Sequence, residues 1–107
     1  MKIKSGIKLR EETEGSGRVI ENGDSILVNL NAWLNAGEKI QTDIKINIDV
    51  GSRRVIAGVE YSVFGMKKQG KRKVKVSPHL AYGEKDVDGL IPKNVVLIYE
   101  IEVLDIV

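Results

Sequence analysis

A chain of 107 residues with 42% apolar and 30% charged residues can bury a hydrophobic core, so we exclude a disordered chain and expect a single domain over residues 1–107. A net charge of only +2 excludes a protein that binds phosphate through its overall charge. There is no cysteine and one histidine, His79, which excludes a disulfide framework, a thiol nucleophile and a multi-histidine metal site. We therefore expect no cofactor and no bound metal.

The first residues of the chain lack the apolar core of a signal peptide. Nowhere does the sequence approach the run of about 18 apolar residues that a membrane-spanning helix needs. We therefore expect a soluble, cytoplasmic monomer with no membrane partner. The lone His79 is expected at the surface.

In the first half of the chain, apolar and polar residues alternate with the period of two that is typical of half-buried β-strands. This alternation predicts strands over residues 3–9, 26–34 and 40–50, with Trp33 on the outer face of the second. The segments around Gly15, Gly23 and Gly37 supply turn residues between the strands and favour an antiparallel sheet. In the 40–50 segment the even positions are predicted to face the core: Ile40, Thr42, Ile44, Ile46, Ile48 and Val50.

In the second half, only one segment changes period. Val55, Val59 and Val63 recur every fourth residue, which predicts a short amphipathic helix. Alternation returns in residues 71–76 and 95–103, which are predicted to be strands. One helix across an antiparallel sheet is an α+β fold, with space for a small apolar pocket between the two layers.

Six basic residues lie between Lys67 and Lys75, which raises the question of a nucleic acid or another anionic partner. Lys71, Lys73 and Lys75 alternate there with Arg72, Val74 and Val76, as on the solvated face of a half-buried strand. No aromatic residue that could stack on a base is interleaved with them. We favour the solvated strand and expect no nucleic-acid partner.

Several local motifs are more specific than the alternation. They are the helix segment Val55–Glu60, the loop Ser77–Gly83, the segment Gly89–Pro92 and the terminal strand Leu97–Leu104. In this order and at this spacing they resemble the FKBP-type peptidyl-prolyl cis-trans isomerases, and weaker likeness covers nearly the whole chain. The resemblance implies a sheet half-wrapped around one short helix and an apolar pocket that binds a proline ring. The implied partners are Pro-containing protein or peptide substrates.

Isomerisation of an X-Pro bond needs little chemistry. The barrier of about 18–20 kcal/mol comes from amide resonance, and a pocket that holds the twisted amide lowers it without a covalent step. By resemblance, the Tyr82 hydroxyl donates to a substrate carbonyl, the backbone N–H of Ile56 meets a second carbonyl, and Gln41 lines the polar side of the pocket. For Tyr82 the alternative is a packed loop aromatic, and for Ile56 core packing serves equally well.

The resemblance also implies which residues line the apolar part of the pocket. Tyr99 on the terminal strand could equally be a core residue, and Val55 could be explained by core packing. The residues expected to contact substrate are Leu30, Ile40, Ile46, Val55, Val59, Ile91 and Tyr99.

The sequence departs from the family mainly at this pocket. Val59 stands where the family has a helix Trp, Leu30 where Tyr is usual, and Gln41 where Asp is usual; Ile40 and Ile46 replace Phe. Losing several aromatic rings removes roughly 150–250 Å² of contact per ring. We therefore expect an isomerase of reduced efficiency and weak or no macrolide binding; the alternative is a catalytically silent module that binds peptides or proteins. The segment between Ile40 and Ile46 is also shorter than in well-known members, which predicts a regular strand without a bulge.

Overall fold

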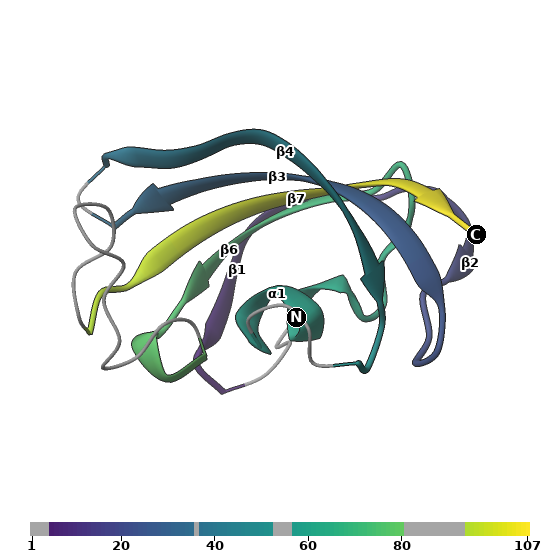
Figure 1. The fold of residues 1–107 in the computed structure, drawn as a ribbon, viewed down its shortest axis with the longest axis horizontal. Helices are drawn as coiled ribbons and strands as arrows, with labels where there is room; N and C mark the ends of the chain where they lie inside the picture. Colours follow the sequence, from purple (N-terminus) through teal and green to yellow (C-terminus); the bar gives the residue numbers. More distant parts are fainter. Residues whose placement is uncertain (1–4, 36, 53–56, 81–93) are drawn as a thin grey trace.

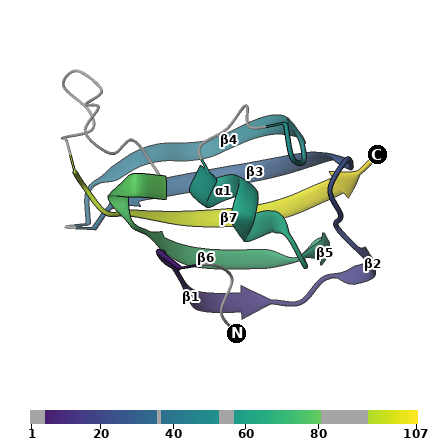
Figure 2. The same cartoon turned by 90° about the horizontal axis from the view of Figure 1, so that it is seen from below.

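The computed structural model describes residues 5–35, 37–52, 57–80 and 94–107. Its main sheet is antiparallel, with the strand order β1-β6-β7-β3-β4. A short ribbon pairs β2 with β5, and the curved sheet covers one helix on its concave face (Figure 1, Figure 2). This arrangement confirms the predicted α+β class. The elements are β1 (Ile7–Thr13), β2 (Ser16–Val19), β3 (Ser25–Leu34), β4 (Lys39–Asp49), α1 (Ala57–Val63), β5 (Lys67–Lys68), β6 (Lys71–Val76), a 3-10 turn (Pro78–Leu80) and β7 (Leu97–Ile106).

The predicted strands are found, and their ends differ where the alternation fades. β3 and β4 begin one residue earlier than predicted, and β7 continues to Ile106. The N-terminal strand was predicted over residues 3–9, but β1 runs from Ile7 to Thr13. Residues 10–13 are all polar and exposed because β1 is an edge strand with little to bury. A strand of that kind leaves no alternating pattern in the sequence.

The prediction that every even position of β4 faces the core is wrong in the middle of the strand. Ile48 is buried, but Ile44 is 41% exposed and Thr42 is exposed. β4 is the other edge strand, and α1 packs mainly against β6 and β7 rather than against β4. The helix is too short to cover the middle of this edge.

The core lies between α1 and the concave face of the sheet (Figure 2). Val59 and Val63 of α1 are buried together with Val74 and Val76 of β6. Each such side chain contributes about 1.5–3 kcal/mol by leaving water. Gly58 lets the helix come this close, because a Cβ there would collide with the Val76 side chain and lie 3.1 Å from the Leu80 carbonyl oxygen.

The lysine-rich strand has the predicted arrangement. Arg72, Val74 and Val76 are buried, and Lys71, Lys73 and Lys75 point to the opposite face, where they are half-buried. His79 is exposed as predicted, with its Nδ1 2.8 Å from the Ser77 hydroxyl.

Arg72 is a charged side chain that is buried in the core, at 2% exposure. Its Nη1 donates to the carbonyl oxygens of Ser62 at 3.0 Å and Phe64 at 2.7 Å, and its Nε lies 2.6 Å from the Glu12 carboxylate. These carbonyls end α1, where the last turn of a helix has no backbone partners of its own. Arg72 therefore fixes the end of the helix to the sheet.

Candidate functional site

The candidate site lies on the concave face of the sheet. Cross-strand pairing places Gln41 of β4 opposite Ala32 of β3, and Ala32 opposite Tyr99 of β7. Leu30 lies on the same face two residues before Ala32. Tyr99 is 2% exposed and Leu30 5%, so both form the floor of this face rather than its rim. Ala32, which no sequence motif indicated, is the small residue that separates Gln41 from Tyr99.

Gln41 reaches this face through a β-bulge. Leu30 pairs with Ile44, whereas Ala32 pairs with Gln41, so Asn31 faces the two residues Thr42 and Asp43. One extra residue reverses which face the following side chains occupy. Strict alternation would leave Gln41 on the outer face with Asp43. The prediction of a regular strand without a bulge is therefore wrong.

The bulge is held by two asparagines of β3. Asp43 has a positive φ of 48°, a conformation that Asp tolerates better than most residues. Its Oδ1 accepts from Asn29 Nδ2 at 3.1 Å and from Asn31 Nδ2 at 3.3 Å, and its backbone N–H donates to Asn31 Oδ1 at 3.0 Å. The hydrogen bond from Asn29, followed by that from Asn31, lowers the pKa of Asp43. The Asp43 carboxylate therefore stays ionised at a lower pH than an ordinary aspartate does. Two asparagines spaced by one residue opposite an aspartate are the signal that could have indicated the bulge.

Gln41 carries a buried side-chain oxygen on this face that is left without a partner in the described part of the chain. Its Oε1 is buried and accepts no hydrogen bond from the residues that the structure describes. A buried acceptor without a partner costs about 1–3 kcal/mol, so it is a position where a ligand donor would be favoured.

The other predicted substrate contacts divide into three groups. Ile40 and Ile46 are half-buried and pack against the core from β4. Val59 is 2% exposed and belongs to the core under α1. Tyr82, Val55, Ile56 and Ile91 lie outside the described residues. The structure thus brings Gln41, Leu30 and Tyr99 onto one face with Ile40 and Ile46.

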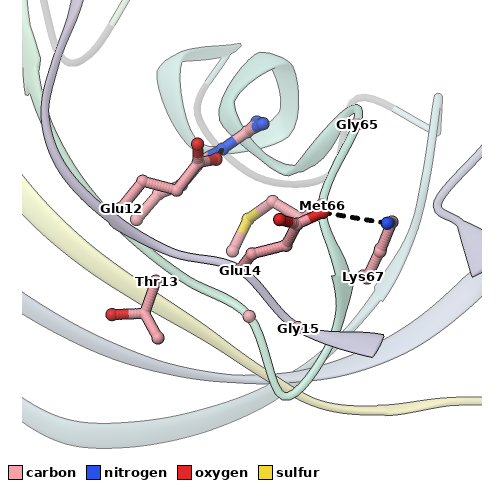
Figure 3. Close-up of a pocket in the computed structure, with 9 residues that line it drawn as sticks. Glu12, Thr13, Glu14, Gly15, Gly65, Met66 and Lys67 are labelled. Atoms are coloured by element: carbon pink, nitrogen blue, oxygen red, sulfur yellow. Dashed lines mark hydrogen bonds and ion pairs between the residues drawn. The ribbon is translucent and has the colours of Figure 1, made fainter. Parts of the chain in front are cut away.

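A separate hollow of about 240 Å³ lies where the end of α1 meets the turn after β1. Figure 3 shows Glu12, Glu14, Met66 and Lys67 around it. Its charges are paired, because Glu12 contacts Arg72 and the Glu14 carboxylate lies 3.0 Å from Lys67 Nζ. This hydrogen bond and the charge of Lys67 lower the pKa of Glu14. We assign the hollow to the packing of the helix end.

Within residues 5–35, 37–52, 57–80 and 94–107, no group of three or more His, Cys, Asp or Glu side chains is arranged to hold a metal ion. The helix found there is also too short and too polar to cross a membrane.

Comparison with known proteins identifies the family. Residues 16–104 match the family model described as FKBP-type peptidyl-prolyl cis-trans isomerase. The chain is 37% identical to FK506-binding protein 1A of Neurospora crassa, over 94% of this chain and 88% of the relative. It is 31% identical to the FK506-binding protein of Neisseria meningitidis serogroup B, over 94% of this chain and 96% of the relative. It also matches FK506-binding protein 4 of Chaetomium thermophilum at 31% identity, over 99% of this chain and only 22% of that longer relative.

These matches agree with the sheet, the short helix and the apolar concave face described above, and they span most of the chain. The chain therefore belongs to the FKBP family of peptidyl-prolyl cis-trans isomerases.

Proposed function

We propose that the chain isomerises X-Pro bonds in extended segments of protein substrates, with Gln41, Leu30 and Tyr99 forming the described part of its site. The observation that carries the proposal is the bulge in β4, which brings Gln41 Oε1, a buried acceptor without a partner among the described residues, to an apolar face. An X-Pro segment offers the N–H groups of its flanking residues, and one of them could donate to this acceptor. The apolar face would disfavour the charge separation of the planar amide and favour the twisted form.

Tyr82 and Ile56 complete this proposal by resemblance to the family. The Tyr82 hydroxyl would donate to a substrate carbonyl, and the Ile56 N–H would do the same at the start of the helix. Neither role requires a general base, because no proton is transferred when the bond rotates. Val55 and Ile91 are proposed to add apolar contact around the proline ring.

We also propose that the isomerase works at reduced efficiency. Leu30, Ile40 and Ile46 are aliphatic, and Val59 lies in the core, so they offer substrate less surface than aromatic rings would. Relatives of this chain are named for binding FK506. The smaller contact surface that these four aliphatic residues offer also supports our proposal of weak macrolide binding by this chain.

The first test is exchange spectroscopy by nuclear magnetic resonance on a Pro-containing tetrapeptide. We expect the protein to accelerate cis/trans exchange measurably and to shift the amide signals of residues near Gln41 and Tyr99. If the peptide shifts these signals while exchange stays at the rate in buffer, the chain is a silent binding module instead. If neither changes at high protein concentration, the proposed site is wrong.

The second test concerns Gln41 itself. Gln41→Leu should lower kcat/KM for the tetrapeptide about twofold to tenfold, the value of one net hydrogen bond, while the free energy of unfolding stays the same or rises. Gln41→Asp retains an acceptor and should lose less activity. Thr42→Val changes the exposed neighbour in the bulge and is the matched control. Equal activity in all three variants would remove Gln41 from the site.

A further inference from the structure

The outer face of the sheet is turned away from α1 (Figure 1). Cross-strand pairing aligns five residues on this face in a row that contains no acidic side chain. Trp33 pairs with Lys39 on β4 and with Ile98 on β7, Ile98 pairs with Lys75 on β6, and Lys75 pairs with Lys8 on β1. Their neighbours along each strand, such as Leu97 and Val76, are buried on the concave side. We call Lys39, Trp33, Ile98, Lys75 and Lys8 the outer-face row.

Two hollows open along this row. Trp33 and Ile98 line one of about 370 Å³, together with Arg10, Lys73, Glu11 and Leu34. Lys8 and Lys75 line the other, of about 270 Å³, together with Ile7 and Val96. Both hollows combine apolar surface with amino groups. Such a surface can take up an apolar side chain and hold anionic groups beside it.

Trp33 organises the charges around the first hollow. The Nζ atoms of Lys39 and Lys73 lie 5.2 Å and 5.0 Å from the centre of its ring, within the range of cation–π contacts. Lys73 also faces Glu11, but at 3.7 Å, and the Glu11 side chain is 73% exposed, so the carboxylate neutralises this ammonium weakly. The tryptophan thus holds two ammonium groups at one apolar site.

We propose that the outer-face row binds an extended acidic segment of a protein partner, whose carboxylates pair with the lysines while an apolar side chain packs against Trp33 and Ile98. Neighbouring strands are about 4.8 Å apart, so Lys39 and Lys75, three strands apart, are separated by about 14 Å. An extended chain rises about 3.3 Å per residue and crosses this distance in about four steps. The segment that fits therefore has acidic residues on both sides of about three apolar ones.

The charge pattern favours a carboxylate-bearing peptide over a nucleic acid. The next row of the same face contains Glu100 and Glu11, which flank Lys73 and would repel a continuous phosphate backbone. The proposed site lies on the face opposite the isomerase site, so it does not depend on the proposed function.

Trp33 is the only tryptophan in the sequence, so its fluorescence reports directly on this face. The probe is a capped peptide with two aspartates on each side of Leu-Phe-Leu, which contains neither proline nor tryptophan. We expect it to change the emission of Trp33 and to bind more weakly as salt is added. A peptide with asparagine in place of every aspartate should bind at least fivefold more weakly.

Matched double variants locate the site. Lys39→Gln with Lys75→Gln should weaken binding of the probe about fivefold to tenfold, as expected for two exposed ion pairs. Lys45→Gln with Lys71→Gln removes the same charge from the same two strands, in the row that contains Asn29 and Glu102, and should leave binding unchanged. Isomerase activity should be the same in both.

Three outcomes would overturn the proposal. The acidic probe could fail to bind, the asparagine peptide could bind equally well, or the two double variants could behave alike. Tighter binding of a thymidine oligonucleotide than of the acidic peptide, lost in the first double variant, would assign the face to nucleic acid instead. None of these outcomes affects the exchange experiment on the tetrapeptide.

Discussion

Replacing Arg72 by methionine lowers the free energy of unfolding by about 3 kcal/mol, because it leaves buried groups without partners. The guanidinium is the donor to the carbonyl oxygens of Ser62 and Phe64 and the ion-pair partner of Glu12. Methionine fills much of the same space but donates nothing. A domain of this size has about 5–15 kcal/mol of stability, so the variant should still fold. Denaturation in urea, followed by circular dichroism, measures the change.

Two comparisons show whether the loss comes from these hydrogen bonds. Lys71→Met removes a positive charge from the neighbouring position of β6, where the side chain points to the outer face, and should change stability by less than about 0.5 kcal/mol. Arg72→Lys keeps the charge without the fork of donors and should give an intermediate loss. If Arg72→Met and Lys71→Met are equally stable, Arg72 does not hold the helix end.

The fold could be predicted because its strands bury one face each. In β3 the apolar even positions from Ile26 to Leu34 are all buried, and in β6 the burial alternates as expected. A helix with valines along one side could then bury that side only by lying across the sheet. Prediction failed at the two edges, β1 and the middle of β4, where solvent reaches the strand and burial no longer selects the residue type.

The candidate site was only partly predictable, because its key feature depends on contacts between strands. Resemblance placed Gln41 in the pocket, whereas the alternation placed it on the outer face with Asp43. The bulge places Gln41 on the concave face, and it rests on hydrogen bonds from Asn29 and Asn31 that join residues far apart in sequence. In the same way, only the register across five strands brings Trp33 beside lysines that the sequence separates from it.

Arg72 shows a further limit of predicting burial from the pattern of residue types. In the sequence it is one of six basic residues near Gly70, and its position between two lysines suggests a charged side chain at the surface. The alternation did place it with Val74 and Val76 on the inner face. Only the helix end above it explains why a charged residue can be buried there, since the carbonyls at the end of α1, which lack backbone partners, accept its hydrogen bonds.

Val59→Trp tests whether the isomerase site can regain the ring that the family carries on its helix. We expect it to destabilise the fold by about 3 kcal/mol and to bring no gain in peptide affinity, because Val59 is 2% exposed and belongs to the hydrophobic core. The adjacent Gly58 already packs so closely against Val76 that a Cβ there would collide with it. The larger ring would have to push the helix away from the sheet. Urea denaturation and the exchange rate of the tetrapeptide give the two measurements.

Tyr61→Trp is the matched control, since Tyr61 lies on the same helix with 38% of its surface exposed. A tryptophan there should change stability by less than about 0.5 kcal/mol, so a loss confined to position 59 reports lack of space and not the helix propensity of tryptophan. The opposite result is equally informative. If the position-59 variant is stable and binds the tetrapeptide more tightly, the pocket extends to Val59. The reduced efficiency that we propose then comes from the missing aromatic ring, and the core has not closed over the space that the ring would occupy.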